Sequence, residues 1–329
     1  MPRNRRVTLA ARPDGFPNES DFAFDEVDIP GPGTGEVLVH LSHASVDPYQ
    51  RGRMSEARSY ARPMEIGDVI TSQSIGEVVE SNDARFAPGD RVLGQLGWQE
   101  YAVARGGSLR KVPAALEPPT LALHAVGATG MTAYFGLFDV GKPRPGDTVV
   151  VSGAAGAVGQ IAGQLAKLAG CRTVGIAGGP EKARDLRDLY GYDAAIDYKA
   201  GGVSDALREE RVDVYFDNVG GEISQAVHRR LNVGARIVIC GQISQYNEPR
   251  PLPSFHPGLL IVYRARMEGF LISDFSHRFD EAATRLARWV ATGRLRWMED
   301  VTDGLENAPG AFIGMLNGAN RGKALLKIR

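Results

Sequence analysis

The sequence predicts an α/β protein in which a β-rich domain precedes a doubly wound domain built on a parallel sheet. From residue 148 onward, β-branched runs suited to buried parallel strands alternate with amphipathic stretches at helical spacing. Before residue 125, short alternating apolar runs are separated by turns such as GPGTG and APGD, a pattern typical of antiparallel sheets. A length of 329 residues suits about two domains. We place the first at residues 1–124 with 302–329 and the second at 125–301.

The elements follow from local patterns. In the first domain the alternation of Val37, Val39 and Leu41 predicts one strand, and the apolar run at residues 75–79 predicts another. A helical segment is expected to connect the domains at 121–140. In the second domain we expect strands near 148–152, 172–177, 194–197, 212–217 and 235–240, with helices near 158–169, 181–189, 203–210 and 223–231. An amphipathic helix near 279–291 precedes strand-like residues 324–328, which we expect to return to the first domain.

Between the first strand and the first helix of the second domain lies GAAGAVG, residues 153–159. Gly156 would let the backbone approach a diphosphate, Gly159 would let the helix pack closely on the strand, and the helix N-terminus favours anions. Ala154 stands where the dinucleotide-binding fingerprint usually has its first glycine, so an ordinary strand-to-helix turn is the alternative. We expect the pyrophosphate contacts to come from four consecutive residues, Gly156, Ala157, Val158 and Gly159.

The end of the second strand indicates which nucleotide is bound. An NAD site usually places Asp or Glu there, whereas this chain has Gly178, Gly179 and Pro180. Lys182 follows in the first turn of the next helix, where its charge suits a 2′-phosphate, although Glu181 adjoins it and a solvated surface lysine is the alternative. We therefore predict NADPH as the cofactor.

Composition excludes several other functions. The net charge is −1, and the longest basic cluster is Arg3, Arg5 and Arg6, so nucleic acid is not expected as a partner. No apolar run approaches a membrane span or a signal-peptide core, which predicts a cytoplasmic protein without membrane contact. Cys171 and Cys240 are too few for a disulfide framework or a zinc ribbon, and we expect both to be small buried side chains.

A β-rich domain followed by this glycine-rich α/β domain resembles the medium-chain dehydrogenase/reductase superfamily. Further motifs along the chain resemble its zinc-independent double-bond reductases, which include prostaglandin and leukotriene reductases, plant alkenal reductases and bacterial curcumin reductase. The motifs are VDPYQRGRM (46–54), GMTAYFGL (130–137), YFDNVGGE (215–222), CGQISQYN (240–247), RMEGFLI (266–272) and ENAPGAFIGMLNGANRGK (306–323). The resemblance implies a GroES-like first domain, a Rossmann second domain and a homodimer.

The resemblance also implies which residues would complete the cofactor site. Lys182 and Tyr198 would hold the adenosine phosphate end. The nicotinamide half would be lined by Asn218, Cys240, Gly241, Phe270, Leu271, Ile272 and Asn320. For Asn218 and Asn320 the alternative is a plain turn asparagine.

The zinc enzymes of the superfamily use Cys and a His-Glu pair in the first domain, and this chain has neither there, so no metal is expected. The expected reaction moves hydride to the β-carbon of an α,β-unsaturated ketone or aldehyde, and charge then develops on the carbonyl oxygen. Neutral donors must hold that oxygen, and Tyr49, Tyr60 and Tyr246 are the candidates. The alternatives are a core tyrosine at 49, an exposed surface at 60 and loop packing at 246.

Tyr263 is a departure from the family pattern. Relatives carry a tyrosine four positions before the Arg of the RM motif, where this chain has Val262, so Tyr263 is one position off register and is expected to be a packing residue. Two other functions remain open at this point: an NADPH quinone reductase and a non-catalytic NADPH-binding sensor or scaffold.

Overall fold

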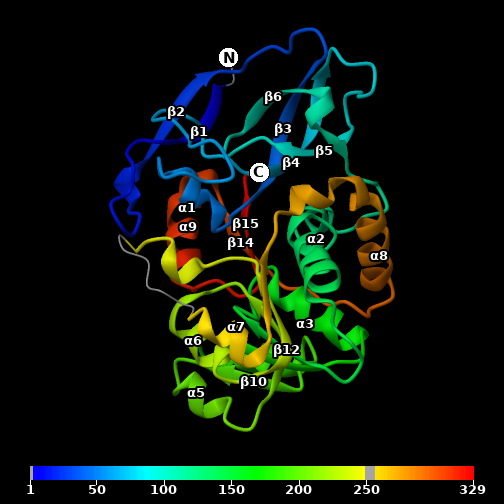
Figure 1. Cartoon of the computed structure of the whole chain (residues 1–329). Coiled ribbons are helices and arrows are strands. Elements are labelled where there is room, and N and C mark those ends of the chain that lie inside the picture. The colour runs from blue at the N-terminus through cyan, green and yellow to red at the C-terminus, as the bar shows by residue number, and fades with distance from the viewer. Residues whose placement is uncertain (1–2, 249–255) are drawn as a thin grey trace. The chain divides into compact units, whose positions relative to one another are not determined.

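The computed structural model describes residues 3–248 and 256–329. The chain forms two compact units, one made of residues 1–123 with 299–329 and the other of residues 124–298. Figure 1 colours the chain from blue to red and shows the red C-terminal segment lying among the blue strands of the first unit. Each unit has its own sheet and its own apolar core.

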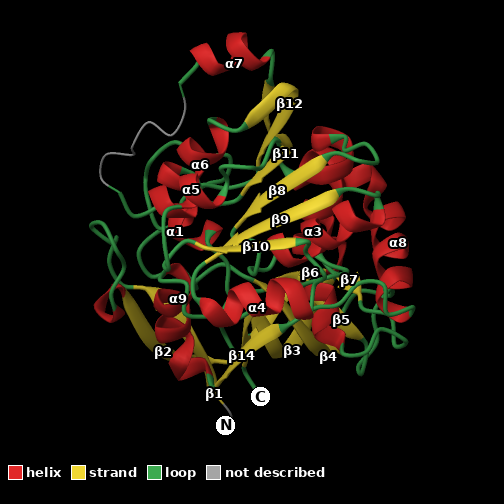
Figure 2. Ribbon diagram, turned by 90° about the horizontal axis from the view of Figure 1, so that it is seen from below, coloured by secondary structure: helices red, strands yellow, loops and turns green. Residues whose placement is uncertain are grey.

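The second unit is built on a parallel sheet with the strand order β10-β9-β8-β11-β12-β13 among the described residues. Every neighbouring pair in it is parallel. The strands are β8 (Thr148–Ser152), β9 (Arg172–Ala177), β10 (Ala194–Asp197), β11 (Val212–Asp217), β12 (Leu231–Ile239) and β13 (Arg266–Gly269). Figure 2 shows the first five side by side as one twisted ladder. The order reverses between β8 and β11, which is where open α/β sheets bind ligands.

Helices cover both faces of this sheet, with α3 and α8 on one side of the ladder in Figure 2 and α5 and α6 on the other. They are α2 (Ala128–Phe135), α3 (Gly159–Leu168), α4 (Pro180–Asp188), α5 (Val203–Ala206), α6 (Gly221–His228), α7 (Gly258–Tyr263) and α8 (Phe279–Ala291). The core between the layers contains Val150, Val174, Tyr215 and Ile237, none more than 1% exposed. The alternation of apolar strands and helices therefore predicted the layers correctly.

The expected helix at residues 121–140 is wrong as a continuous element. It is divided into a 3₁₀ helix (Pro119–Leu123), α2 and a π-helical segment (Gly136–Gly141). Gly127, the N-cap of α2, is extended with φ −96° and ψ −153°, so the helix starts anew at Ala128. A Cβ at Gly130 would lie 2.0 Å from the carbonyl oxygen of Ala125, so only glycine permits the chain to fold back this closely.

Three other elements in the second unit also differ from the expected bounds. The fifth strand begins at Leu231 rather than 235, α5 ends at Ala206 rather than 210, and α6 spans Gly221–His228 rather than 223–231. The edge strand β13 was not predicted at all, because it is short and has no alternating pattern.

The first unit contains a largely antiparallel sheet with the order β14-β15-β3-β4-β5-β7, in which β6 also pairs with β3, and a separate pair β1-β2. Its strands are β1 (Arg3–Leu9), β2 (Phe22–Asp28), β3 (Glu36–Ser45), β4 (Gln73–Ser81), β5 (Arg91–Gln95), β6 (Tyr101–Arg105), β7 (Arg110–Lys111), β14 (Glu299–Asp303) and β15 (Lys323–Lys327). Two helices belong to it, α1 (Tyr49–Arg53) and α9 (Ala308–Leu316). The C-terminal strand β15 pairs with β3, with Leu325 opposite Ser45, which confirms the expected return of the chain.

Candidate functional site

The turn after β8, residues 153–158, is a tight glycine-rich turn, and we call it the phosphate turn after its predicted role. Gly153 has φ +57°, a left-handed conformation that favours glycine, and the backbone N–H of Ala154 donates to Ile176 at 3.0 Å. The glycine that makes the tight turn therefore stands one position before Ala154, which explains why the fingerprint looked incomplete. A Cβ at Gly159 would lie 2.3 Å from the carbonyl oxygen of Gly153, so this glycine lets α3 pack on the turn.

The N-terminus of α3 follows this turn and receives no side-chain cap from Val158 at its N-cap position. The first N–H groups of a helix lack intrahelical acceptors and carry partial positive charge. A nucleotide pyrophosphate fits such a terminus, because it supplies the acceptor oxygens that no capping side chain provides here.

The predicted cofactor residues of the second unit follow the carboxyl ends of its parallel strands. Asn218 follows β11, and its side-chain amide donates to the Ser152 carbonyl at 2.7 Å, which ties it to the end of β8. A Cβ at Gly241, after β12, would lie 3.3 Å from both the Asn218 carbonyl and the Tyr246 hydroxyl. The structure thus brings Asn218, Gly241 and Tyr246 together beside the phosphate turn.

Asp217 organises this cluster, although sequence reasoning missed it. Asp217 is 1% exposed, and its backbone carbonyl oxygen accepts from the N–H groups of Cys240 (2.9 Å) and Gly241 (3.1 Å). The carboxylate accepts from Ser152, Tyr215, Ser224, Val219 and Gly220. A buried charge is tolerated only when its acceptor sites are filled in this way. An acid after the apolar run VYF was the signal that could have revealed it.

Lys182 and Tyr198 follow two neighbouring strands, β9 and β10. Lys182 is half-buried in the first turn of α4, and Tyr198 follows β10 with 42% of its surface exposed. A Cβ at Gly178 would lie 2.8 Å from the Tyr198 ring, so the absence of a side chain after β9 lets this ring cover the turn. A carboxylate from β10 also reaches this turn, since Asp197 accepts from the Gly179 N–H at 2.7 Å.

Three further candidates for the nicotinamide half, Phe270, Leu271 and Ile272, follow one another directly after β13. The ring of Phe270 packs against Gly136, where a Cβ would lie 2.6 Å from it, and meets Phe275 edge to face. Leu271 is 38% exposed, and its N–H donates to Asp274 at 3.2 Å. Ile272 begins the next 3₁₀ helix.

The two cysteines differ in exposure. Cys171 is buried, as expected, whereas Cys240 is partly accessible, so that expectation is wrong for Cys240. Burial, reinforced by Asp217, nevertheless raises the pKa of the Cys240 thiol to about 12, so it is a neutral side chain and not a thiolate nucleophile.

In the first unit, Tyr49 is the first residue of α1 and is half-buried. Its hydroxyl oxygen is buried and makes no hydrogen bond of standard geometry with any described residue. Burial raises the pKa of Tyr49, Asp47 adds to this, and the side chain of Gln95 opposes it. The phenol therefore stays protonated as a hydrogen-bond donor through the neutral range.

The other two candidate tyrosines, Tyr60 and Tyr246, and the amide of Asn320 differ from Tyr49 in exposure or in hydrogen bonding. Tyr60 is 66% exposed. The Tyr246 hydroxyl accepts from the Gln242 N–H at 3.2 Å, which anchors its own loop. Asn320 donates to Gly322 at 2.7 Å within the turn before β15. Tyr263 packs against the core of the second unit, as expected for a residue off the family register.

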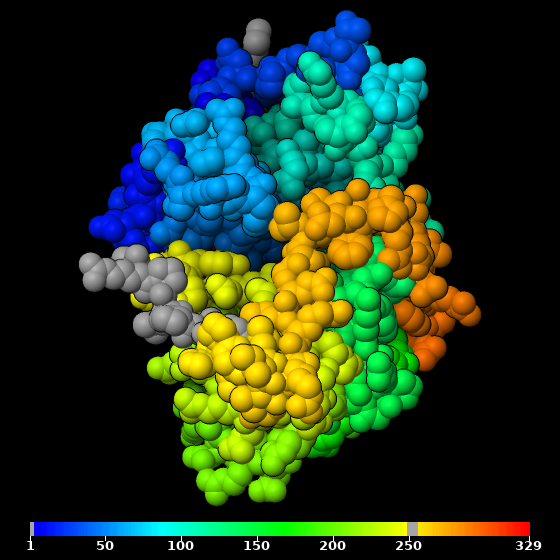
Figure 3. Space-filling view, in the orientation of Figure 1, coloured from blue at the N-terminus to red at the C-terminus, as the bar shows by residue number. Residues whose placement is uncertain are grey.

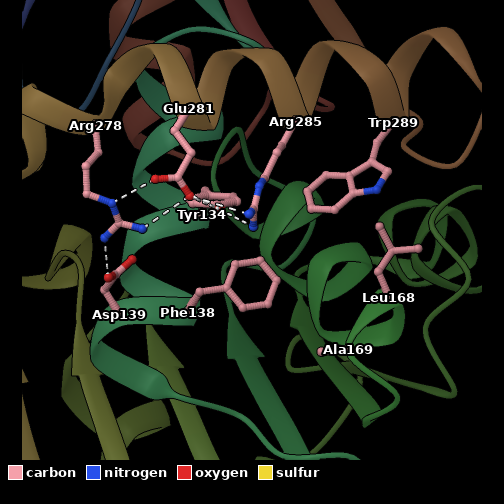
Figure 4. Close-up of a pocket in the computed structure, with 9 residues that line it drawn as sticks. All are labelled: Tyr134, Phe138, Asp139, Leu168, Ala169, Arg278, Glu281, Arg285 and Trp289. Atoms are coloured by element: carbon pink, nitrogen blue, oxygen red, sulfur yellow. Dashed lines mark hydrogen bonds and ion pairs between the residues drawn. The ribbon is translucent and has the colours of Figure 1, made fainter.

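A surface cavity of about 450 Å³ in the second unit contains none of the predicted site residues (Figure 4). Arg278 pairs there with Asp139 and Glu281, while Arg285 donates to the Tyr134 hydroxyl at 2.8 Å. These charged groups form ion pairs with one another, and we attribute the cavity to the packing of α8 on α2.

Comparisons with known proteins identify the family of the chain. Residues 5–112 match a family model described as the N-terminal domain of oxidoreductase, and residues 157–288 match one described as zinc-binding dehydrogenase. The NADPH-dependent curcumin reductase of Escherichia coli is 42% identical, covering 99% of this chain and 97% of that protein. Prostaglandin reductase 1 of Rattus norvegicus is 41% identical, covering 99% and 100%. The crystal structure of CurA in complex with NADPH from Vibrio vulnificus has a TM-score of 0.94 and 43% identity, covering 99% of each chain.

The fold and the site define a pyridine-nucleotide oxidoreductase with a Rossmann-type domain. The chain belongs to the medium-chain dehydrogenase/reductase superfamily, and within it to the NADP-dependent, zinc-independent double-bond reductases. It is an NADPH-dependent oxidoreductase. Although one family model is described by zinc, no three His, Cys, Asp or Glu side chains within 3–248 and 256–329 are grouped to hold a metal ion. In that same part of the chain, no helix combines the length and apolarity needed to cross a membrane.

Proposed function

We propose that the protein reduces the carbon–carbon double bond of α,β-unsaturated ketones or aldehydes. The observation that carries this proposal is the buried, protonated Tyr49 hydroxyl, which makes no hydrogen bond of standard geometry within the described part of the chain. Leaving such a group unpaired costs about 1–3 kcal/mol. A substrate carbonyl oxygen that gains negative charge during the reaction is an acceptor that would recover this cost.

Bound NADPH supplies the hydride in this reaction. We assign the pyrophosphate to Gly156, Ala157, Val158 and Gly159, the adenosine end to Lys182 and Tyr198, and the nicotinamide half to Asn218, Cys240 and Gly241 with Phe270, Leu271, Ile272 and Asn320. We assign the carbonyl oxygen to Tyr49, with Tyr60, an exposed residue, and Tyr246, whose hydroxyl already accepts a hydrogen bond, as secondary candidates.

The function is tested by following NADPH oxidation at 340 nm with a panel of small enones and enals, after treatment with a chelator. Turnover with products reduced at the carbon–carbon bond supports the proposal. Turnover with quinones alone would instead identify a quinone reductase, and tight NADPH binding without any turnover would identify a sensor or scaffold.

Lys182→Ala is expected to weaken NADPH binding about tenfold, or about 1.4 kcal/mol, because a charge-assisted contact with the 2′-phosphate is lost. NADH binding should stay within about twofold, since NADH lacks that phosphate. Calorimetry with both nucleotides measures the effect, and Arg187→Ala in the last turn of the same helix is the matched control. An equal loss for both nucleotides would contradict the assignment of Lys182.

We also propose that the protein is a homodimer. Strand β13 lies at the edge of its sheet within the described residues, and the adjacent helix α7, gold in Figure 3, exposes Ile261 by 80% and Val262 by 61%. An unpaired edge beside exposed apolar side chains is suited to a second copy of the chain. Light scattering should then give twice the chain mass of 35.4 kDa, whereas the monomer mass at micromolar concentration would refute this.

A further inference from the structure

Lys323 is a charged side chain in the interior of the first unit, and nothing in the proposed chemistry uses it directly. It begins β15 and is 0% exposed. Its ammonium group donates to the Asp47 carboxylate at 2.9 Å and to the carbonyls of Val46 at 2.8 Å and Ala324 at 2.9 Å. All three ammonium hydrogens therefore have acceptors, and two of these acceptors belong to the turn that precedes Tyr49.

Burying an ion pair is costly, and replacing it by apolar side chains is often neutral or stabilising. Burial lowers the pKa of Lys323, and Asp47 and, more weakly, Glu299 oppose this shift. A buried pair of this kind is thus poor evidence for a role in stability alone. It does constrain the position of the turn at residues 46–47.

The turn held by Lys323 is fixed from other directions as well. The second oxygen of the Asp47 carboxylate accepts from the Ser45 hydroxyl, and the Asp47 N–H donates to Gln50 at 2.8 Å. Gln50 is fully buried and donates to the Thr71 carbonyl at 2.7 Å. Residues 47 and 50 therefore hold the segment on both sides of Tyr49, while the Tyr49 hydroxyl itself makes no hydrogen bond of standard geometry in the part of the chain that the structure describes.

We propose that Lys323 is a positioning residue that, through Asp47, holds the Tyr49 hydroxyl where it can donate to the substrate carbonyl. This inference rests on the proposed function, since it gives Tyr49 its acceptor. It adds to the proposed machinery of the first unit a residue that lies 276 positions from Asp47 in the sequence.

The test is a double-mutant comparison of Lys323→Met in the wild-type and Tyr49→Phe backgrounds. Methionine keeps an unbranched apolar stem and removes the charge. In the wild-type background we expect kcat for an enone to fall about tenfold or more, with KM for NADPH within about threefold. In the Tyr49→Phe background the same substitution should change kcat by less than about twofold, because the hydroxyl it positions is already absent.

A merely structural role would lower kcat by the same factor in both backgrounds, and that result would overturn the proposal, as would an unchanged kcat in the wild-type background. Lys327→Met is the matched control, since Lys327 lies on the same strand in an exposed pair with Asp303. Should Lys323→Met not fold, Asp47→Asn weakens the same tie from the other side.

A second measurement separates this inference from the proposed function. A crystal structure of Lys323→Met should show the Tyr49 hydroxyl displaced relative to its position in Lys327→Met. If the wild-type protein reduced no enone but the hydroxyl moved, the proposed function would fail and the positioning role would stand. An unmoved hydroxyl would overturn the positioning role whatever the activity.

Discussion

Gly159→Ala is expected to weaken NADPH binding about 100-fold, corresponding to about 2.7 kcal/mol. The added Cβ would lie 2.3 Å from the Gly153 carbonyl oxygen and 2.6 Å from Ala154 Cα, and both atoms belong to the backbone. Neither can move without opening the phosphate turn, so the start of α3 must shift away from the position that a diphosphate needs. Calorimetric titration with NADPH measures the loss.

The control for this substitution is Gly310→Ala in α9, where no atom lies within 4 Å of the added Cβ. It makes the same chemical change within a helix and should leave NADPH affinity within about twofold. Thermal unfolding of both variants distinguishes loss of binding from loss of the fold. A folded Gly159→Ala protein with unchanged affinity would show that the pyrophosphate is not held by this turn.

Tyr49→Phe is expected to lower kcat for enone reduction about 100-fold, since one donor to a developing oxyanion contributes roughly 3 kcal/mol in the transition state. The KM for NADPH should change little, because the hydroxyl acts on the substrate. The pKa of Tyr49 is raised above the ordinary tyrosine value of about 10, so the phenol stays protonated. Loss of this proton should therefore not limit the rate up to about pH 10. Steady-state kinetics across pH measure both effects.

Tyr101→Phe is the matched control for Tyr49→Phe. Tyr101 belongs to the same unit, and its ring stacks on His40 at a centroid separation of 4.2 Å, so its contribution is packing by the ring. Its loss should leave kcat within about twofold. A Tyr49→Phe enzyme as active as this control would remove Tyr49 from the reaction and make Tyr60 or Tyr246 the next candidate.

The local sequence predicted the parallel sheet closely. Strands at 148–152, 172–177, 194–197 and 212–217 occur where expected, because each is an apolar run bounded by turn residues. The glycine-rich turn between β8 and α3 was also located from sequence, because the pattern of strand, glycines and helix is itself local. Ala154 stands at the first glycine position of the fingerprint, but the left-handed conformation lies at Gly153, because a fingerprint does not specify which residue takes the positive φ.

The sequence by itself determined the fold class, the NADPH cofactor and the family, because strand and helix periodicity and the spacing of short motifs survive as properties of contiguous residues. Only the tertiary structure decided which polar groups are buried together. Asp217 accepts from donors on β8, β11 and α6 and in the turn before α6, and Lys323 contacts Asp47 across 276 positions. Such pairs depend on which elements the fold brings side by side. No local pattern encodes how close two side chains lie in space, or the burial that strengthens a polar contact between them.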